Sequence, residues 1–280
     1  MVNRLMKIMC CVVVVLALAV TGCQRKTKQV KGPGQPPLTY TPAAETISVT
    51  NSYAPRAIAA TGGYETWLNT PEIDYDCVVA FYKPDNSFYL TQQHYNIYPW
   101  SNSIRITSPE PQGKIVWQLS NGNFTVPANA KLIDTLALPM NKRDFADAIL
   151  NITTASVRLL DKSSDFTRSD EPVKLQGRWY YQIERTASAI AAQQLNDPNF
   201  VEPPQYNKRW SKAIFYQDTE SANIDMLWLT DFGNNQFYLA RAYDYRPTTK
   251  DGVQIPSKIE IFTTNEKGVI QQRLVKIDLK

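Results

Sequence analysis

Few residues in this 280-residue chain have the types and spacing that enzyme chemistry needs. His94 is the only histidine, so any nucleophile activated by a histidine would have to use it. It lies in a predicted strand between Gln93 and Tyr95, and no G-x-S-x-G motif is nearby. We therefore expect His94 to have a structural or surface role.

The remaining thiol and the acidic residues add little. One histidine and Cys77 cannot supply the usual ligands of a zinc site, and Cys77 in an apolar strand is expected to be a buried thiol. Sugar-hydrolysing enzymes need only two acids that face a cleft, so a carboxylate-dependent hydrolase stays as an alternative. The available acids resemble those of ordinary turns and strand edges: Asp74, Asp76, Glu184, Asp225 and Asp231. The sequence predicts no catalytic, metal or cofactor site, no cofactor and no enzyme activity.

Cys23 is the residue with the clearest chemistry. An apolar run over 8–19, too short for a comfortable transmembrane helix, follows two basic residues and precedes the small-residue stretch Val20-Thr21-Gly22. The pattern resembles the bacterial lipoprotein signal, in which an aliphatic residue, a small residue and Gly or Ala precede a cysteine that receives diacylglycerol. We predict a signal peptide over 1–22 and fatty acylation of Cys23, including palmitate.

Residues 23–52 are predicted to form a lipidated, disordered tether, because this polar, Gly- and Pro-rich segment has almost nothing apolar to bury. Gln24 stands where an Asp would resemble an inner-membrane retention signal. We expect a lipid anchor in the cell envelope, at the outer membrane and facing the periplasm. The membrane is thus the expected partner. A net charge of +4 over the whole chain argues against a nucleic-acid partner.

Residues 53–280 are predicted to form one mostly β domain. Alternating apolar residues predict a meander of antiparallel strands between Cys77 and Val126, and further strands between Gly177 and Leu279. Asn121-Gly122 is a hairpin signal, since both residues tolerate positive φ. The strand over 223–230 is apolar on both faces, so we expect it to be covered on both sides.

Helices are predicted at two places, with a short third one at 187–195 inside an insertion over 186–210. The first, over 54–68, contains Gly62-Gly63, which predicts a break or a close approach to the sheet. The second, over 141–160, has Asn141 as its cap and an apolar stripe that should lie on the sheet.

The aromatic side chains in the strands have two interpretations. A thick sheet core explains most of them, but they would also suit an apolar concave face that accepts a ligand. The residues predicted to line such a site are Trp117, Trp179, Trp228, Phe237 and Tyr243.

The order of these elements resembles the LolA/LolB-type lipoprotein-carrier superfamily. The resemblance includes a Tyr-containing strand followed by Asp251-Gly252 and Ile255-Pro256. It implies an α+β, mostly β fold, an open antiparallel half-barrel with one or two helices packed against it. It also implies a concave face that accepts acyl chains of lipoproteins or other lipids.

These observations predict a membrane-anchored envelope lipoprotein that binds a lipid or a lipidated, hydrophobic ligand in its half-barrel. The alternative is a non-catalytic structural or assembly lipoprotein that uses the same sheet as a scaffold for protein docking.

Overall fold

The computed structural model describes residues 53–280, apart from 137, 162–163, 188–209, 211, 232 and 249–251. The predicted signal peptide over 1–22, the lipidated Cys23 and the tether over 23–52 lie outside the described residues. So does the helix expected over 187–195, except for Ala187. None of the helices in the described part has the length and apolarity that crossing a membrane requires.

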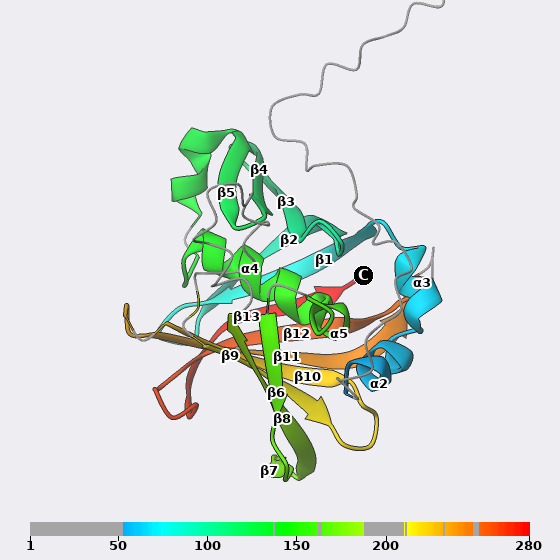
Figure 1. The fold of residues 1–280 in the computed structure, drawn as a ribbon. Coiled ribbons are helices and arrows are strands. Elements are labelled where there is room, and N and C mark those ends of the chain that lie inside the picture. Colours follow the sequence, from blue (N-terminus) through cyan, green and yellow to red (C-terminus); the bar gives the residue numbers. More distant parts are fainter. Residues whose placement is uncertain are drawn as a thin grey trace, which may run out of the picture. The chain divides into compact units, whose positions relative to one another are not determined.

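The fold is built on one open antiparallel sheet of 13 strands (Figure 1). The order across it is β5-β4-β3-β2-β1-β13-β12-β11-β10-β9-β8-β6, and β7 also pairs with β8. The strands are β1 (Ile73–Tyr82), β2 (Phe88–Tyr98), β3 (Ser103–Glu110), β4 (Gly113–Ser120), β5 (Asn123–Ala128), β6 (Ser164–Arg168), β7 (Val173–Leu175), β8 (Arg178–Ala187), β9 (Lys212–Asp218), β10 (Ile224–Asp231), β11 (Gln236–Pro247), β12 (Gln254–Thr264) and β13 (Ile270–Leu279).

The middle of the sheet joins the first strand to the last. β1 pairs with β2 on one side and with β13 on the other, and Cys77 lies opposite Leu279 in the second pair. The two hairpin-connected arms of the sheet meet at this junction. The predicted class, a mostly β open half-barrel with helices against it, is confirmed.

Two short helices replace the single helix expected over 54–68. They are α2 (Tyr53–Ala60) and α3 (Tyr64–Leu68), and Gly62 and Gly63 between them have φ angles of 115° and 86°. A Cβ atom on Gly62 would lie 3.2 Å from the carbonyl oxygen of Gly252, so the backbones approach closely there. The predicted break occurs, whereas the close approach is to Gly252, which precedes β12 and is not part of the sheet.

The long helix lies across the sheet, and the face that it covers is called the helix-covered face below; the opposite side is the outer face. α4 (Lys142–Thr153) adjoins β3 and β4 at one end and β10, β11 and β12 at the other. Asn141 caps it, because its side chain accepts a hydrogen bond of 2.9 Å from the backbone of Arg143. A separate turn, α5 (Ala155–Arg158), follows, so the helix expected over 141–160 is divided at Thr154. A 3₁₀ helix, η1 (Ala130–Thr135), precedes both.

Strand β10 is covered on both faces, as expected. Leu227 and Leu229 belong to the main core on the helix-covered face. Met226 belongs to a second, smaller cluster on the outer face with Tyr180 and Leu239. The sheet therefore has a large core on one side and a small apolar patch on the other.

Candidate functional site

The helix-covered face is the first candidate surface, and it is apolar over most of the sheet. Its side chains meet across neighbouring strands, with Ile106 opposite Trp117 and Val275 opposite both Phe81 and Ile261. All five belong to one continuous buried cluster. A surface of this kind suits an acyl chain or another apolar ligand.

Helix α4 occupies this face in the structure. The ring of Phe145 packs against the ring of Phe81, with centroids 5.4 Å apart. The same helix also buries polar groups: Asp147 accepts hydrogen bonds from the side chains of Asn151 and Trp210. The buried side of α4 thus combines an aromatic contact at Phe145 with polar contacts at Asp147.

A buried arginine lies near this polar part. Arg185 of β8 is buried, and burial lowers the pKa of its guanidinium, while the negative charges of Asp147 and Asp161 act in the opposite direction. Burial of such groups carries a desolvation cost even when they are paired. This cost reduces the net stability with which α4 holds to the sheet.

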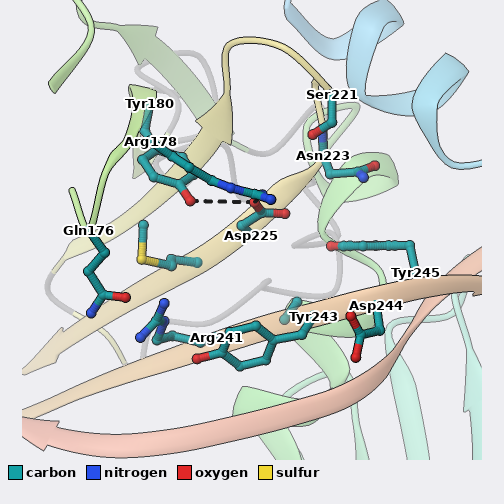
Figure 2. A pocket seen from close by; sticks show the side chains of 12 residues that line it. Gln176, Arg178, Tyr180, Ser221, Asn223, Asp225, Arg241, Tyr243, Asp244 and Tyr245 are labelled. Carbon is teal, nitrogen blue, oxygen red and sulfur yellow. Dashed lines mark hydrogen bonds and ion pairs between the residues drawn. The ribbon is translucent and has the colours of Figure 1, made fainter. Parts of the chain in front are cut away.

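The second candidate surface is a pocket of about 570 Å³ on the outer face (Figure 2). It is called the outer pocket below. Three strands supply its main walls: β8, β10 and β11. The residues of these strands that line it are Arg178, Tyr180, Asp225, Met226, Arg241, Ala242, Tyr243, Asp244 and Tyr245.

A β-bulge brings Asp225 into the outer pocket. The β9–β10 register shifts between Ile224 and Met226, so Asp225 is the extra residue without a partner on β9. Non-glycine residues with positive φ flank the same pocket, Ala222 with a φ of 62° and Asp244 with a φ of 52°. Such backbone is costly and is common at functional sites.

Asp225 is the electrostatic centre of the outer pocket. Its carboxylate lies 3.3 Å from Nη1 of Arg178 and accepts a hydrogen bond of 3.5 Å from the hydroxyl of Tyr180. Burial raises the pKa of Asp225 to about 6, and the nearby charge of Asp218 adds to this, while Arg178 opposes it. A carboxyl group in this environment changes its charge near neutral pH.

The residues predicted to line a ligand site do not share one surface. Trp117 is fully buried on the helix-covered face, and Trp179 is 48% exposed near the start of β8. Trp228 packs on the outer cluster, and Phe237 points to the same side by strand alternation with Leu239. Tyr243 lines the outer pocket. Contact with a ligand stays a prediction for all five.

The candidate acids are also dispersed. Asp74 and Asp76 face His94, at 3.5 Å and 2.9 Å, on a partly exposed part of β1 and β2. Glu184 lies 2.6 Å from Lys212, and Asp231 accepts hydrogen bonds from Asn234 within a turn. Of the five candidate acids, Asp225 alone lines the outer pocket.

The thiol agrees with the expectation from sequence. Cys77 is fully buried, and burial raises the pKa of its thiol to about 12. Within the described ranges no three His, Cys, Asp or Glu side chains gather in a way that could hold a metal ion.

Sequence reasoning missed the arginines of the outer pocket. Arg178 and Arg241 come from different strands, and no local motif marks either of them. Only the register of the strands brings them beside Asp225.

Comparison with known proteins identifies the fold. No protein-family model matches the chain, and no curated protein matches it. A LolA superfamily protein from Nitrosomonas europaea aligns over 82% of this chain and 90% of its own, with 11% identity and a TM-score of 0.50. A domain from Vibrio parahaemolyticus, named for outer membrane lipoprotein sorting, aligns over 82% and 89% with 9% identity and a TM-score of 0.44. A DUF1329 family protein from Desulfovibrio piger aligns over 82% and 90% with 8% identity and a TM-score of 0.44.

The chain has a LolA-like fold, as the likeness to the Nitrosomonas protein shows. The resemblance noted from the order of elements is confirmed at the level of the fold.

Proposed function

We propose that this chain is an envelope lipoprotein that binds the acyl chain of a lipid, or of a lipidated partner, between α4 and the sheet. The observation that carries the proposal is the continuous apolar cluster that lies between the open sheet and α4. The proposed role is binding, without catalysis.

Access to the apolar face is the first step. Because the side chains beneath α4 are buried, an acyl chain reaches them only when the helix moves away from part of the sheet. The ligand then replaces helix contacts such as the one between Phe145 and Phe81. The exchange also separates the buried Arg185 of β8 from the negative charge of Asp147 on α4, which adds to its cost.

The anchor completes the proposal. A lipid on Cys23, followed by the tether over 23–52, would hold the domain beside the membrane from which a lipid ligand comes. The absence of Asp after the cysteine supports an outer-membrane site that faces the periplasm.

Contact quenching tests the site. We expect fatty acids brominated along the acyl chain to quench tryptophan fluorescence of the full chain in nonionic detergent, because bromine quenches only at close range. Trp117→Phe should remove part of this quenching, since Trp117 lies within the apolar face.

Trp179→Phe is the matched control, because Trp179 is exposed outside that cluster, and its quenching should stay near the wild-type level. Lipid-free protein in native mass spectra together with no quenching would overturn the proposal. Quenching that depends on Trp179 and not on Trp117 would place the lipid on another surface.

A protein-docking scaffold is the second candidate function, and one observation favours it. Phe88 and Leu90 of β2 are 54% and 61% exposed, at alternating positions of one strand. Exposed apolar neighbours of this kind are typical of contact surfaces. Two results together would favour this role. A variant that binds no acyl probe should keep its function in the cell, and Leu90→Lys should lose that function.

A further inference from the structure

We propose that the outer pocket is a second binding site, separate from the acyl site, for a small organic carboxylate whose charge pairs with Arg241. This inference does not depend on the proposed function, because Asp225, Arg241 and Tyr243 do not belong to the apolar cluster beneath α4.

The charges around the outer pocket are paired unevenly. Arg178 lies between two carboxylates, 3.3 Å from Asp225 and 3.8 Å from Asp218. Lys258 lies 3.4 Å from Asp244 on the rim. Each of these acids already has a cation beside it.

Arg241 has no such partner. The nearest acid across the strand pair is Glu260, which is held by Arg273 at 3.2 Å and by the hydroxyl of Tyr243 at 2.9 Å. Within the described residues, Arg241 makes neither an ion pair nor a hydrogen bond, and its Nε atom is buried. A partly buried guanidinium without an acceptor is unfavourable, so the position is suited to an external anion.

The orientation of Arg241 is set in advance. Its guanidinium carbon lies 5.0 Å from the centre of the Tyr243 ring. This contact restricts the side chain, and a planar fork held on an aromatic ring is well placed for a bidentate contact with a carboxylate. Figure 2 shows the two side chains together at the floor of the pocket.

The size and the walls indicate what else the ligand carries. A volume of about 570 Å³ is much larger than an inorganic ion needs and falls in the range of small-molecule sites. Tyr180, Met226 and Tyr243 can contact an apolar or aromatic body. The side-chain oxygen of Asn223 is buried without a hydrogen-bond partner and can accept one from a ligand hydroxyl.

One negative charge fits better than two. Among the described residues that line the pocket, Arg241 is the one cation without a paired acid, and the acids named above oppose a second negative charge. Asp225 of β10 faces Arg178 and Tyr180 of β8, Asp218 of β9 and, across the pocket, Arg241 and Tyr243 of β11. When Asp225 gains a proton the pocket becomes more positive, so affinity for the anion should rise at lower pH.

Calorimetry on the full chain in nonionic detergent tests the site with 4-hydroxybenzoate, which keeps a single charge between pH 5.5 and 7.5. We expect binding that is at least threefold tighter at pH 5.5 than at pH 7.5. The uncharged 4-hydroxybenzamide should bind at least tenfold more weakly. Asp225→Asn should bind 4-hydroxybenzoate at pH 7.5 as tightly as the wild type does at pH 5.5.

Arg241→Met should weaken 4-hydroxybenzoate at least tenfold, because it keeps the length of the side chain and removes the charge. Arg246→Gln is the matched control, since Arg246 is an exposed arginine of the same strand outside the pocket. Arg241→Lys keeps the charge but removes the planar guanidinium, so it should weaken binding at least fivefold. This variant replaces Arg241→Met in the test if Arg241→Met does not fold.

Three results would overturn the inference. These are no heat of binding at millimolar 4-hydroxybenzoate, equal affinity for the benzamide, or unchanged affinity in the Arg241 variants. Acyl-chain quenching should persist in Arg241→Met, so a failure here is distinguishable from a failure of the acyl site.

Discussion

Asp225 makes the stability of the domain depend on pH. The pKa of a free aspartate, 3.8, is raised to about 6 by burial in the folded chain. Between these values the folded state keeps a proton that the unfolded state has lost. The free energy of unfolding contributed by this group therefore falls as pH rises from about 4 to about 6, and it stays low above that.

Asp225→Asn should raise the free energy of unfolding at pH 7.5 by about 1–2 kcal/mol. A shift of about two pKa units, which already includes the opposing effect of Arg178, corresponds to roughly 3 kcal/mol, and solvent screening of this partly buried carboxylate reduces it. Urea denaturation at pH 4.5 and 7.5 measures the effect, and the variant should lose less stability between the two.

Glu184→Gln is the control for this substitution, because Glu184 sits in a partly exposed pair with Lys212 and should change stability little. A variant at Asp225 that is destabilised at both pH values would contradict the assignment.

Residue chemistry was only partly predictable from sequence. Asp225 stood among five equivalent acids, because its distinguishing features are a bulge and the neighbours that strand pairing brings. Alternation of side chains gives no sign of a bulge. The burial of Cys77 followed from residue type and its place in an apolar strand.

At the scale of elements, the N-terminal cap of α4 should contribute more to the stability of the domain than the exposed side chains of the helix. Asn141→Ala removes the acceptor for the amide of Arg143 and should lower the free energy of unfolding by about 1 kcal/mol. Urea denaturation measures the loss, and hydrogen exchange should accelerate first in the initial turn of α4.

Asn141→Ser is the matched variant, since serine also caps helices, and it should keep most of the stability. Equal stability of the Ala and Ser variants, both at the wild-type level, would show that the cap contributes nothing.

Long, regular elements were predictable and short ones were not. Alternation and turn signals located β1 to β5 and β8 to β13, and the period of apolar residues located α4. The strands β6 and β7 have five and three residues, and neither carries enough alternation to be recognised. They form because β8 offers them a partner, which is a tertiary cause.

At the scale of the whole molecule, anchoring is predicted to be separable from folding. Cys23→Ala should leave the domain folded, because the sheet and its helices lie within 53–280, and should move the protein from the membrane fraction to the soluble one. Metabolic labelling with palmitate should disappear in this variant.

Cys77→Ala is the matched control, because Cys77 is a buried thiol in β1 and should not carry the label. Palmitate labelling that persists in Cys23→Ala would refute the assignment of the lipidated residue.

The fold as a whole was predictable where sequence order reflects spatial order. The order of hairpin-connected strands and helices resembled that of the LolA/LolB-type proteins, and this resemblance implied the half-barrel. The likeness in fold to the Nitrosomonas protein agrees with it. The outer pocket was not predictable, because it depends on the register of β8 to β11.

The pairing of β1 with β13 has a consequence for how the chain folds. Residues about 200 positions apart in sequence are hydrogen-bonded neighbours at the centre of the sheet. Until β13 is available, β1 and β12 are unpaired edges in a half-formed sheet, so the rate of folding should be set by this last closure. In the export proposed for this chain, the centre of the sheet would stay open until the final strand had emerged from the membrane pore.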